Sequence, residues 1–111
     1  MKIVENTHNG IPVFALKGKI MDWDKGSLLR GKIVESLTAG NKRIVLDLSG
    51  IDWVNSVGLG LLVSIHSTVL KAGGSLALAN IQNIEKILTI TKLVTIFDVF
   101  DSLDEALATS G

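Results

Sequence analysis

Cysteine and tyrosine are absent from this chain of 111 residues, and proline occurs once. Without cysteine, the chain can form neither a disulfide nor a thiolate metal site. His8 and His66 are the only histidines, so a zinc site is not expected either. Aromatic residues make up only 5% of the chain, which predicts a core of Ile, Leu, Val and Ala. We predict neither a bound metal nor a cofactor.

Neither sign of charge is in excess, because eleven Lys and Arg residues balance eleven Asp and Glu residues. A nucleic-acid-binding protein usually presents a basic patch, so we exclude nucleic acid as the main partner. The chain also has no signal peptide and no apolar run of about 18 residues that could span a bilayer. We therefore expect one cytoplasmic domain, residues 1–111, without membrane insertion.

Strand and helix patterns alternate along the chain. Two short strands, at 2–5 and 11–16, flank Asn9 and Gly10, a pair typical of tight hairpins, so these strands should pair antiparallel. A loop is predicted over 18–24. A helix then runs through Leu29, Ile33 and Leu37 and ends at Gly40, and a strand follows at 43–48. The next helix begins after Ser56 and ends at Gly73, and it is followed by a strand at 75–80 and a helix carrying Ile81, Ile84, Ile87 and Leu88. A last strand is predicted at 95–100, and a last helix from the capping box at Ser102 to Thr109. This order predicts an α/β fold with a mixed, mostly parallel β-sheet, an N-terminal antiparallel strand pair and about four packed helices.

Ser56 lies where a strand pattern gives way to a helix pattern. Backbone N–H groups at a helix start lack intrahelical partners and the helix dipole is positive there, so a phosphate on this serine would be stabilised. Ordinary helix capping is the alternative, since Ser and Asn are both frequent N-cap residues. Both interpretations of Ser56 remain open from these residues alone.

Other residues near Ser56 in the sequence allow a structural or a functional interpretation. Gly60 falls inside the predicted helix, where glycine is unfavourable, so we expect another part of the backbone to approach closely there. Trp53 is either a binding anchor beside Ser56 or part of the core. Asp47 and Asp52 do not form a convincing acid pair, because an Asp at the end of a strand more often bonds its own turn.

Four segments of the chain belong together as a family pattern: Gly18-Lys19-Ile20, Asp47-Leu48-Ser49-Gly50, Asn55-Ser56-Val57-Gly58-Leu59-Gly60 and the segment 97–107. Through these segments the chain resembles the STAS family, named for sulfate transporters and anti-sigma factor antagonists. This resemblance implies a STAS fold, and it implies that Ser56 is phosphorylated by an anti-sigma factor that is itself a serine kinase, with a phosphatase to reverse the reaction. The unphosphorylated form would bind that partner. By this resemblance the partner-binding residues are Asp22, Asp24, Trp53, Asn55, Ser56, Val57 and Gly58.

Three positions depart from the family pattern. Asn55 replaces an acidic residue, Val57 replaces a hydroxyl residue, and Met21 stands where many members have an acid, whose role Asp22 or Asp24 would then fill. The departures at Asn55 and Val57 leave an alternative function open. In it the chain is a STAS subunit of a lipid-transporting ABC complex that docks on an ATPase without being phosphorylated. An enzymatic function has only the lone Ser56 in its favour, so we do not expect an enzyme.

Overall fold

A computed structural model describes residues 1–21 and 23–108 of the chain. Two predicted positions, Asp22 and Thr109, lie outside the described residues. The elements in chain order are β1 (Lys2–His8), β2 (Ile11–Ile20), α1 (Trp23–Thr38), β3 (Arg43–Val54), α2 (Ser56–Lys71), β4 (Ser75–Ala79), α3 (Glu85–Ile90), the 3₁₀-helix η1 (Leu93–Thr95), β5 (Asp98–Phe100) and α4 (Leu103–Ala108).

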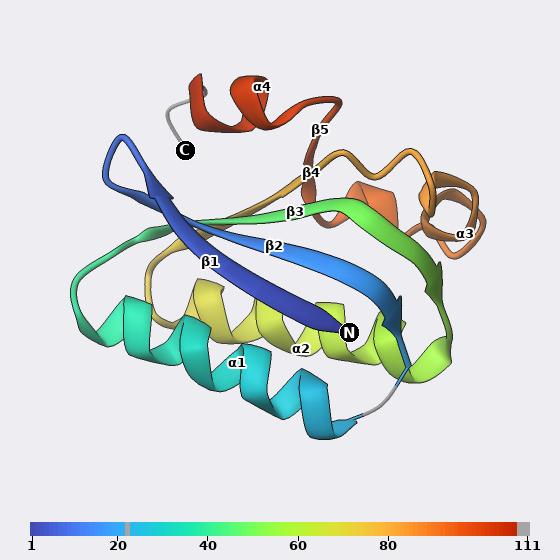
Figure 1. Ribbon diagram of the computed structural model, residues 1–111, viewed down its shortest axis with the longest axis horizontal. Helices are drawn as coiled ribbons and strands as arrows, with labels where there is room; N and C mark the ends of the chain where they lie inside the picture. Colours follow the sequence, from blue (N-terminus) through green and yellow to red (C-terminus); the bar gives the residue numbers. More distant parts are fainter. Residues whose placement is uncertain (22, 109–111) are drawn as a thin grey trace.

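The five strands form one sheet in the order β1-β2-β3-β4-β5 (Figure 1). β1 pairs antiparallel with β2, and the other neighbouring pairs are parallel. At the hairpin between β1 and β2, Asn9 and Gly10 have φ of 54° and 79°, which a tight two-residue turn requires. The predicted mixed sheet with an N-terminal antiparallel pair is confirmed.

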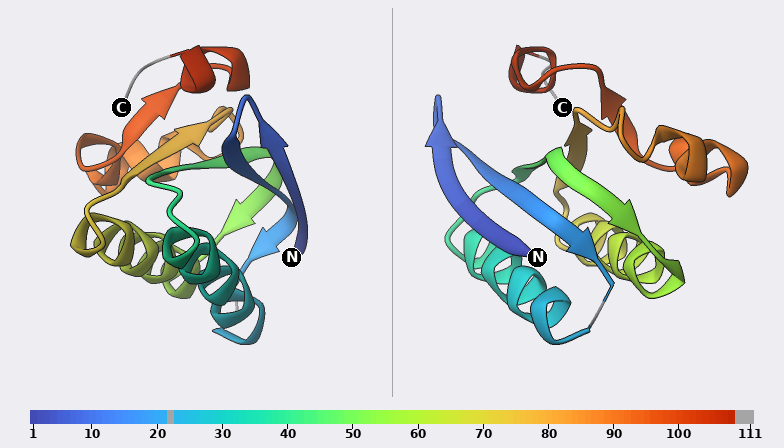
Figure 2. Two further views of the ribbon diagram at one scale, coloured as in Figure 1. Left: turned by 90° about the vertical axis from the view of Figure 1, so that its left-hand side faces the viewer. Right: turned by 45° about the vertical axis from the view of Figure 1, so that its right-hand side comes forward.

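Helices cover both faces of the sheet. Figure 2 shows α1 and α2 side by side on one face and α4 on the other. Alternation along the strands sends side chains to both layers: Phe14 and Leu46 join the large core cluster beneath the sheet, whereas Val13 and Val45 join a smaller cluster with Ala106 of α4. The Arg43 guanidinium supports α4 by donating to the carbonyl oxygen of Ala106 at 2.9 Å.

Three strands are longer than predicted, and the first of them, β1, continues through His8 rather than ending at Glu5. β2 continues through Ile20, where a loop was expected from Gly18, and β3 continues through Val54 rather than ending at Leu48. Register shifts occur between Ala15 and Lys17 and between Gly18 and Lys19, so the pairing of β2 with β3 contains irregularities. Such irregularities interrupt the alternation of buried and exposed residues along a strand. Because the ends of β2 and β3 lack this alternation, their sequence pattern was interpreted as a loop or a turn.

The C-terminal third also differs in detail from the prediction. The segment 95–100 was expected to be one strand, but Thr95 ends η1 and only Asp98–Phe100 pairs with β4. The predicted cap at Ser102 is confirmed, because its Oγ accepts a hydrogen bond from the Glu105 N–H at 3.1 Å and α4 follows directly. α3 is limited to six residues, with Ile84 as its N-cap residue.

Candidate functional site

Asn55, and not Ser56, caps helix α2. Its backbone is extended, with φ −106° and ψ −173°, and its side-chain Oδ1 accepts a hydrogen bond from the Gly58 N–H at 2.9 Å. The same side chain reaches back to the end of β2, where its Nδ2 donates to the Met21 carbonyl oxygen at 3.5 Å. The alternative interpretation of Ser56 as the helix cap is therefore wrong.

Ser56 is the first residue of α2, and its side chain is exposed. Its hydroxyl forms no hydrogen bond with any described residue. The backbone N–H groups of Ser56 and Val57 likewise have no partner among the described residues. Ser56 thus presents a hydroxyl that no structural role occupies, at the positive end of a helix of 16 residues.

Within α2, Gly58 is the glycine that the packing requires. A Cβ atom built on it would lie 2.6 Å from Cγ2 of Val54 and would overlap the carbonyl oxygen of Ile20. The expectation of a close approach at Gly60 is wrong, because a Cβ atom there would meet nothing within 4 Å. The close approach lies two residues earlier because α2 begins directly against the end of β2, which the Asn55 N–H also contacts through the Ile20 carbonyl at 3.3 Å.

The other predicted binding residues differ in how far their side chains are exposed. Trp53 is 54% exposed at the end of β3, so it is not a core residue. Asp24 is exposed in the first turn of α1. Val57 is half-buried and Gly58 is buried, which leaves Ser56 as the accessible residue at the start of α2. Met21, the residue found in place of an acid, is 46% exposed and is joined to Asn55 through its carbonyl.

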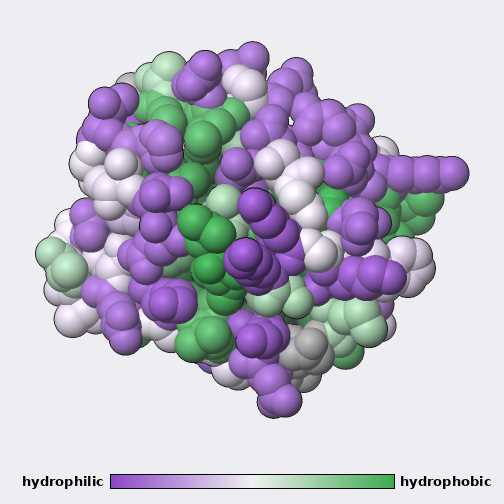
Figure 3. All heavy atoms as spheres, in the orientation of Figure 1, coloured by the Kyte–Doolittle hydropathy of each residue, from purple (hydrophilic) through white to green (hydrophobic). Residues whose placement is uncertain are grey.

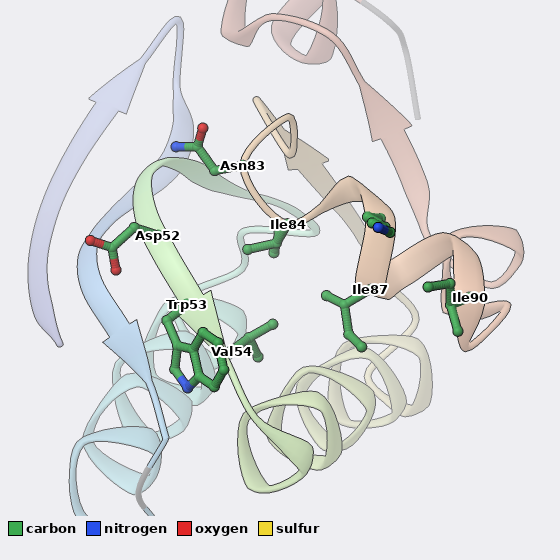
Figure 4. A pocket seen from close by; sticks show the side chains of 8 residues that line it. Asp52, Trp53, Val54, Asn83, Ile84, Ile87 and Ile90 are labelled. Atoms are coloured by element: carbon green, nitrogen blue, oxygen red, sulfur yellow. The ribbon is translucent and has the colours of Figure 1, made fainter.

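A groove of about 280 Å³, which the sequence pattern did not predict, lies beside Trp53. Figure 4 shows Trp53 and Val54 of β3 on one side and Ile84, Ile87 and Ile90 at α3 on the other. Asp52, Asn83 and Lys86 complete its lining. The isoleucines recur at a spacing of three residues, a signal that could have indicated an apolar wall, but their spacing alone is equally typical of core residues.

Asp47 and His66 make contacts within the fold. Asp47 Oδ1 accepts from the Ser49 N–H at 3.1 Å and from Asn80 Nδ2 at 3.0 Å, but Asp47 lies inside β3 and not in the turn that was expected at the end of a strand. The His66 ring packs edge-on against Phe97, with 5.1 Å between ring centroids. Among the described residues, no three His, Asp or Glu side chains gather as a metal site would require.

A family model of the STAS domain matches residues 2–106. The chain belongs to the STAS family. A relative in Thermotoga neapolitana, assigned as an anti-sigma factor antagonist, is 32% identical over 108 residues, which cover 96% of this chain and 91% of the relative. This STAS domain has no helix within residues 1–21 and 23–108 that is long and apolar enough to cross a membrane.

Solved structures show the same fold. The crystal structure of a protein from Thermotoga maritima, also assigned as an anti-sigma factor antagonist, superposes with a TM-score of 0.82 at 22% identity, covering 95% of this chain and 91% of that one. The Bacillus anti-sigma factor antagonist SpoIIAA has a TM-score of 0.71 at 17% identity in both its unphosphorylated and its phosphorylated form. These matches cover 96% of this chain and 94% and 96% of SpoIIAA, respectively. At such identities the likeness concerns the fold.

Proposed function

We propose that this STAS domain is an anti-sigma factor antagonist, a binding protein of the cytoplasm rather than an enzyme. Its partner is an anti-sigma factor that is also a serine kinase, which it binds while Ser56 is unphosphorylated and releases once Ser56 carries a phosphate. A phosphatase returns it to the binding form. The observation that carries this proposal is the exposed Ser56 hydroxyl, which is free of any capping role because Asn55 performs it.

The location of Ser56 decides what a phosphate would do. Near a helix N-terminus a negative charge is favourable by about 0.3–1 kcal/mol, so phosphorylation should leave the fold intact. A charge of nearly −2 in the middle of a docking surface instead adds desolvation and like-charge penalties. A penalty of about 3 kcal/mol would weaken binding roughly a hundredfold. The switch would therefore act on the partner interface and not on folding.

Asn55 explains how this domain can lack the family's acidic residue. Its amide oxygen caps α2, as a carboxylate oxygen would, but its Nδ2 also donates to the Met21 carbonyl, which a carboxylate cannot do. The amide also removes a charge that would repel a phosphate on Ser56. Asn55→Asp should thus retain the cap, and we expect it to alter recognition by the kinase more than it alters stability.

The proposal is tested with the cognate anti-sigma serine kinase of this domain. Incubation of the domain with that kinase and ATP should add one phosphate, detected by mass spectrometry, and Ser56→Ala should abolish it. Ser49→Ala, which removes another exposed hydroxyl, is the matched control and should be phosphorylated normally.

Capture of the kinase then separates the two functions considered. Ser56→Asp should fail to bind the kinase, whereas Ser56→Ala should bind it as the parent does. Equal capture of the kinase by both variants would contradict the switch. It would leave the docking subunit of a membrane-transport ABC complex as the better account of this domain.

A further inference from the structure

The second half of β3 has a strand partner on one side only. β4 pairs with β3 from Arg43 to Asp47 and then ends, whereas β2 continues alongside β3 as far as Val54. Among the described residues, no strand pairs with the other edge of β3 beyond Asp47. A strand edge of this kind presents backbone N–H and C=O groups that can pair with another chain.

Side chains already occupy the first position of this open edge. The N–H group of Ser49 donates to Asp47 Oδ1, and its carbonyl oxygen accepts from Asn83 Nδ2 at 3.2 Å. From Gly50 to Val54, no described residue outside β2 forms a hydrogen bond with the β3 backbone. The open part of the edge is therefore about one short strand in length.

The groove beside Trp53 lies along the last three residues of this open part, Asp52 to Val54. Its opposite wall is apolar, formed by Ile84, Ile87 and Ile90, and Ile90 exposes 66% of its surface. Figure 3 shows a largely hydrophilic face with hydrophobic side chains emerging in its middle and at the right-hand margin, the side on which α3 lies in Figure 1. An open strand edge and an apolar wall thus face the same space.

We propose that this groove binds an extended peptide segment of a partner protein, which adds as a strand to the edge of β3 at residues 50–54. The backbone of the segment would pair with β3, and every second side chain would point towards the apolar wall of α3, the mode known as β-strand addition. Asp52 and Lys86 carry opposite charges at the groove and favour a segment with charges of both signs around an apolar centre. This inference goes beyond the proposed function and does not require phosphorylation of Ser56.

Other occupants fit the groove less well. A small molecule bound against the apolar wall of α3 would leave the N–H and C=O groups at the open edge of β3 unpaired. An amphipathic helix needs a trough that accommodates about three successive turns of anchors, and α3 has only six residues. Neither occupant would use the open backbone of β3.

The test selects peptides displayed on phage, with random sequences of about six residues, the usual strand length. Selection uses the full chain, and enriched peptides are then synthesised and their affinity measured by calorimetry. Ile90→Asp should weaken binding at least about tenfold, because it places a charge in the apolar wall. Ile96→Asp is the matched control: Ile96 is 44% exposed, lies outside the groove, and its substitution should leave binding unchanged.

Backbone methylation distinguishes strand addition from side-chain anchoring alone. N-methyl groups on every second amide of the peptide should abolish binding in one phase of the alternation and be tolerated in the other. Amide exchange at residues 50–54 should slow when the peptide binds. The proposal is wrong if no peptide is enriched over selection on Ile90→Asp, if Ile96→Asp weakens binding as much, or if both methylation phases are tolerated, as they would be for a helix or a single side-chain anchor.

Discussion

The first half of β3, residues 43–48, and its second half, residues 49–54, have different surroundings within one strand. The first half pairs with β2 and β4 and sends buried side chains to both faces of the sheet. The second half pairs with β2 alone, and its buried residues Ile51 and Val54 follow Leu48 at every third position, while Asp52 and Trp53 are exposed. The first half of β3 therefore belongs to the core of the sheet, whereas the second half exposes side chains next to Ser56.

The largest expected effect lies in the first half. Leu46 is fully buried in the main core cluster, so Leu46→Ala should lower the free energy of unfolding by about 2–5 kcal/mol, measured by chemical denaturation. Leu70→Ala removes the same atoms from an exposed leucine of α2 and is the control, with a change of less than about 0.5 kcal/mol. Similar losses in both variants would remove the distinction between core and surface on which the comparison depends.

A smaller loss is expected where the second half joins α2. Gly58→Ala places a methyl group against the Ile20 carbonyl and Val54, and should cost about 1–3 kcal/mol through overpacking. Gly60→Ala meets no neighbour and should stabilise the helix by about 0.5–1 kcal/mol. Thermal unfolding of the two variants should shift in opposite directions, and a shift in the same direction would contradict our placement of the close contact.

The helix cap gives the next effect in size. Asn55→Ala removes the acceptor for the Gly58 N–H and should cost about 0.5–2 kcal/mol, whereas Ser56→Ala should change stability by less than about 0.5 kcal/mol. Denaturation of both variants under one condition makes the comparison direct. If Ser56→Ala proved the more harmful of the two, the assignment of the cap to Asn55 would have to be given up.

The smallest effect on stability is expected at Trp53. Because the side chain is more than half exposed at the end of β3, Trp53→Ala should change the free energy of unfolding by only about 0.5 kcal/mol or less. Denaturation followed by circular dichroism provides the measurement. A loss as large as that of Leu46→Ala would show that the second half of β3 belongs energetically to the core.

Local signals predicted much of the fold. Asn9 and Gly10 have the positive φ values expected of their hairpin, Gly40 has φ of 100° after α1, and the Ser102 cap forms as expected. Each of these features depends on the conformational or hydrogen-bonding preferences of one or two residues, which the sequence displays directly.

The errors concern features that depend on contacts distant in the sequence. The second half of β3 was not predicted, because shifts in its register with β2 interrupt the alternation of buried and exposed residues. Its buried residues instead recur at every third position. Gly60 was chosen over Gly58 because helix propensity cannot indicate which glycine faces the Ile20 carbonyl. The position of Ser56 at the helix start was predicted, but the division of roles between Asn55 and Ser56 required the geometry of the cap.

The order of the strands in the sheet has a consequence for how the domain is built during synthesis. Because the spatial order β1-β2-β3-β4-β5 is also the order along the chain, no strand has to be inserted between two that are already paired. Each strand leaving the ribosome can join the edge left by its predecessor, and the long pairing of β2 with β3 can form before β4 exists. The sheet can therefore grow in one direction, and shortening the chain from its C-terminus removes β5 and then β4 from the outer edge of the sheet first.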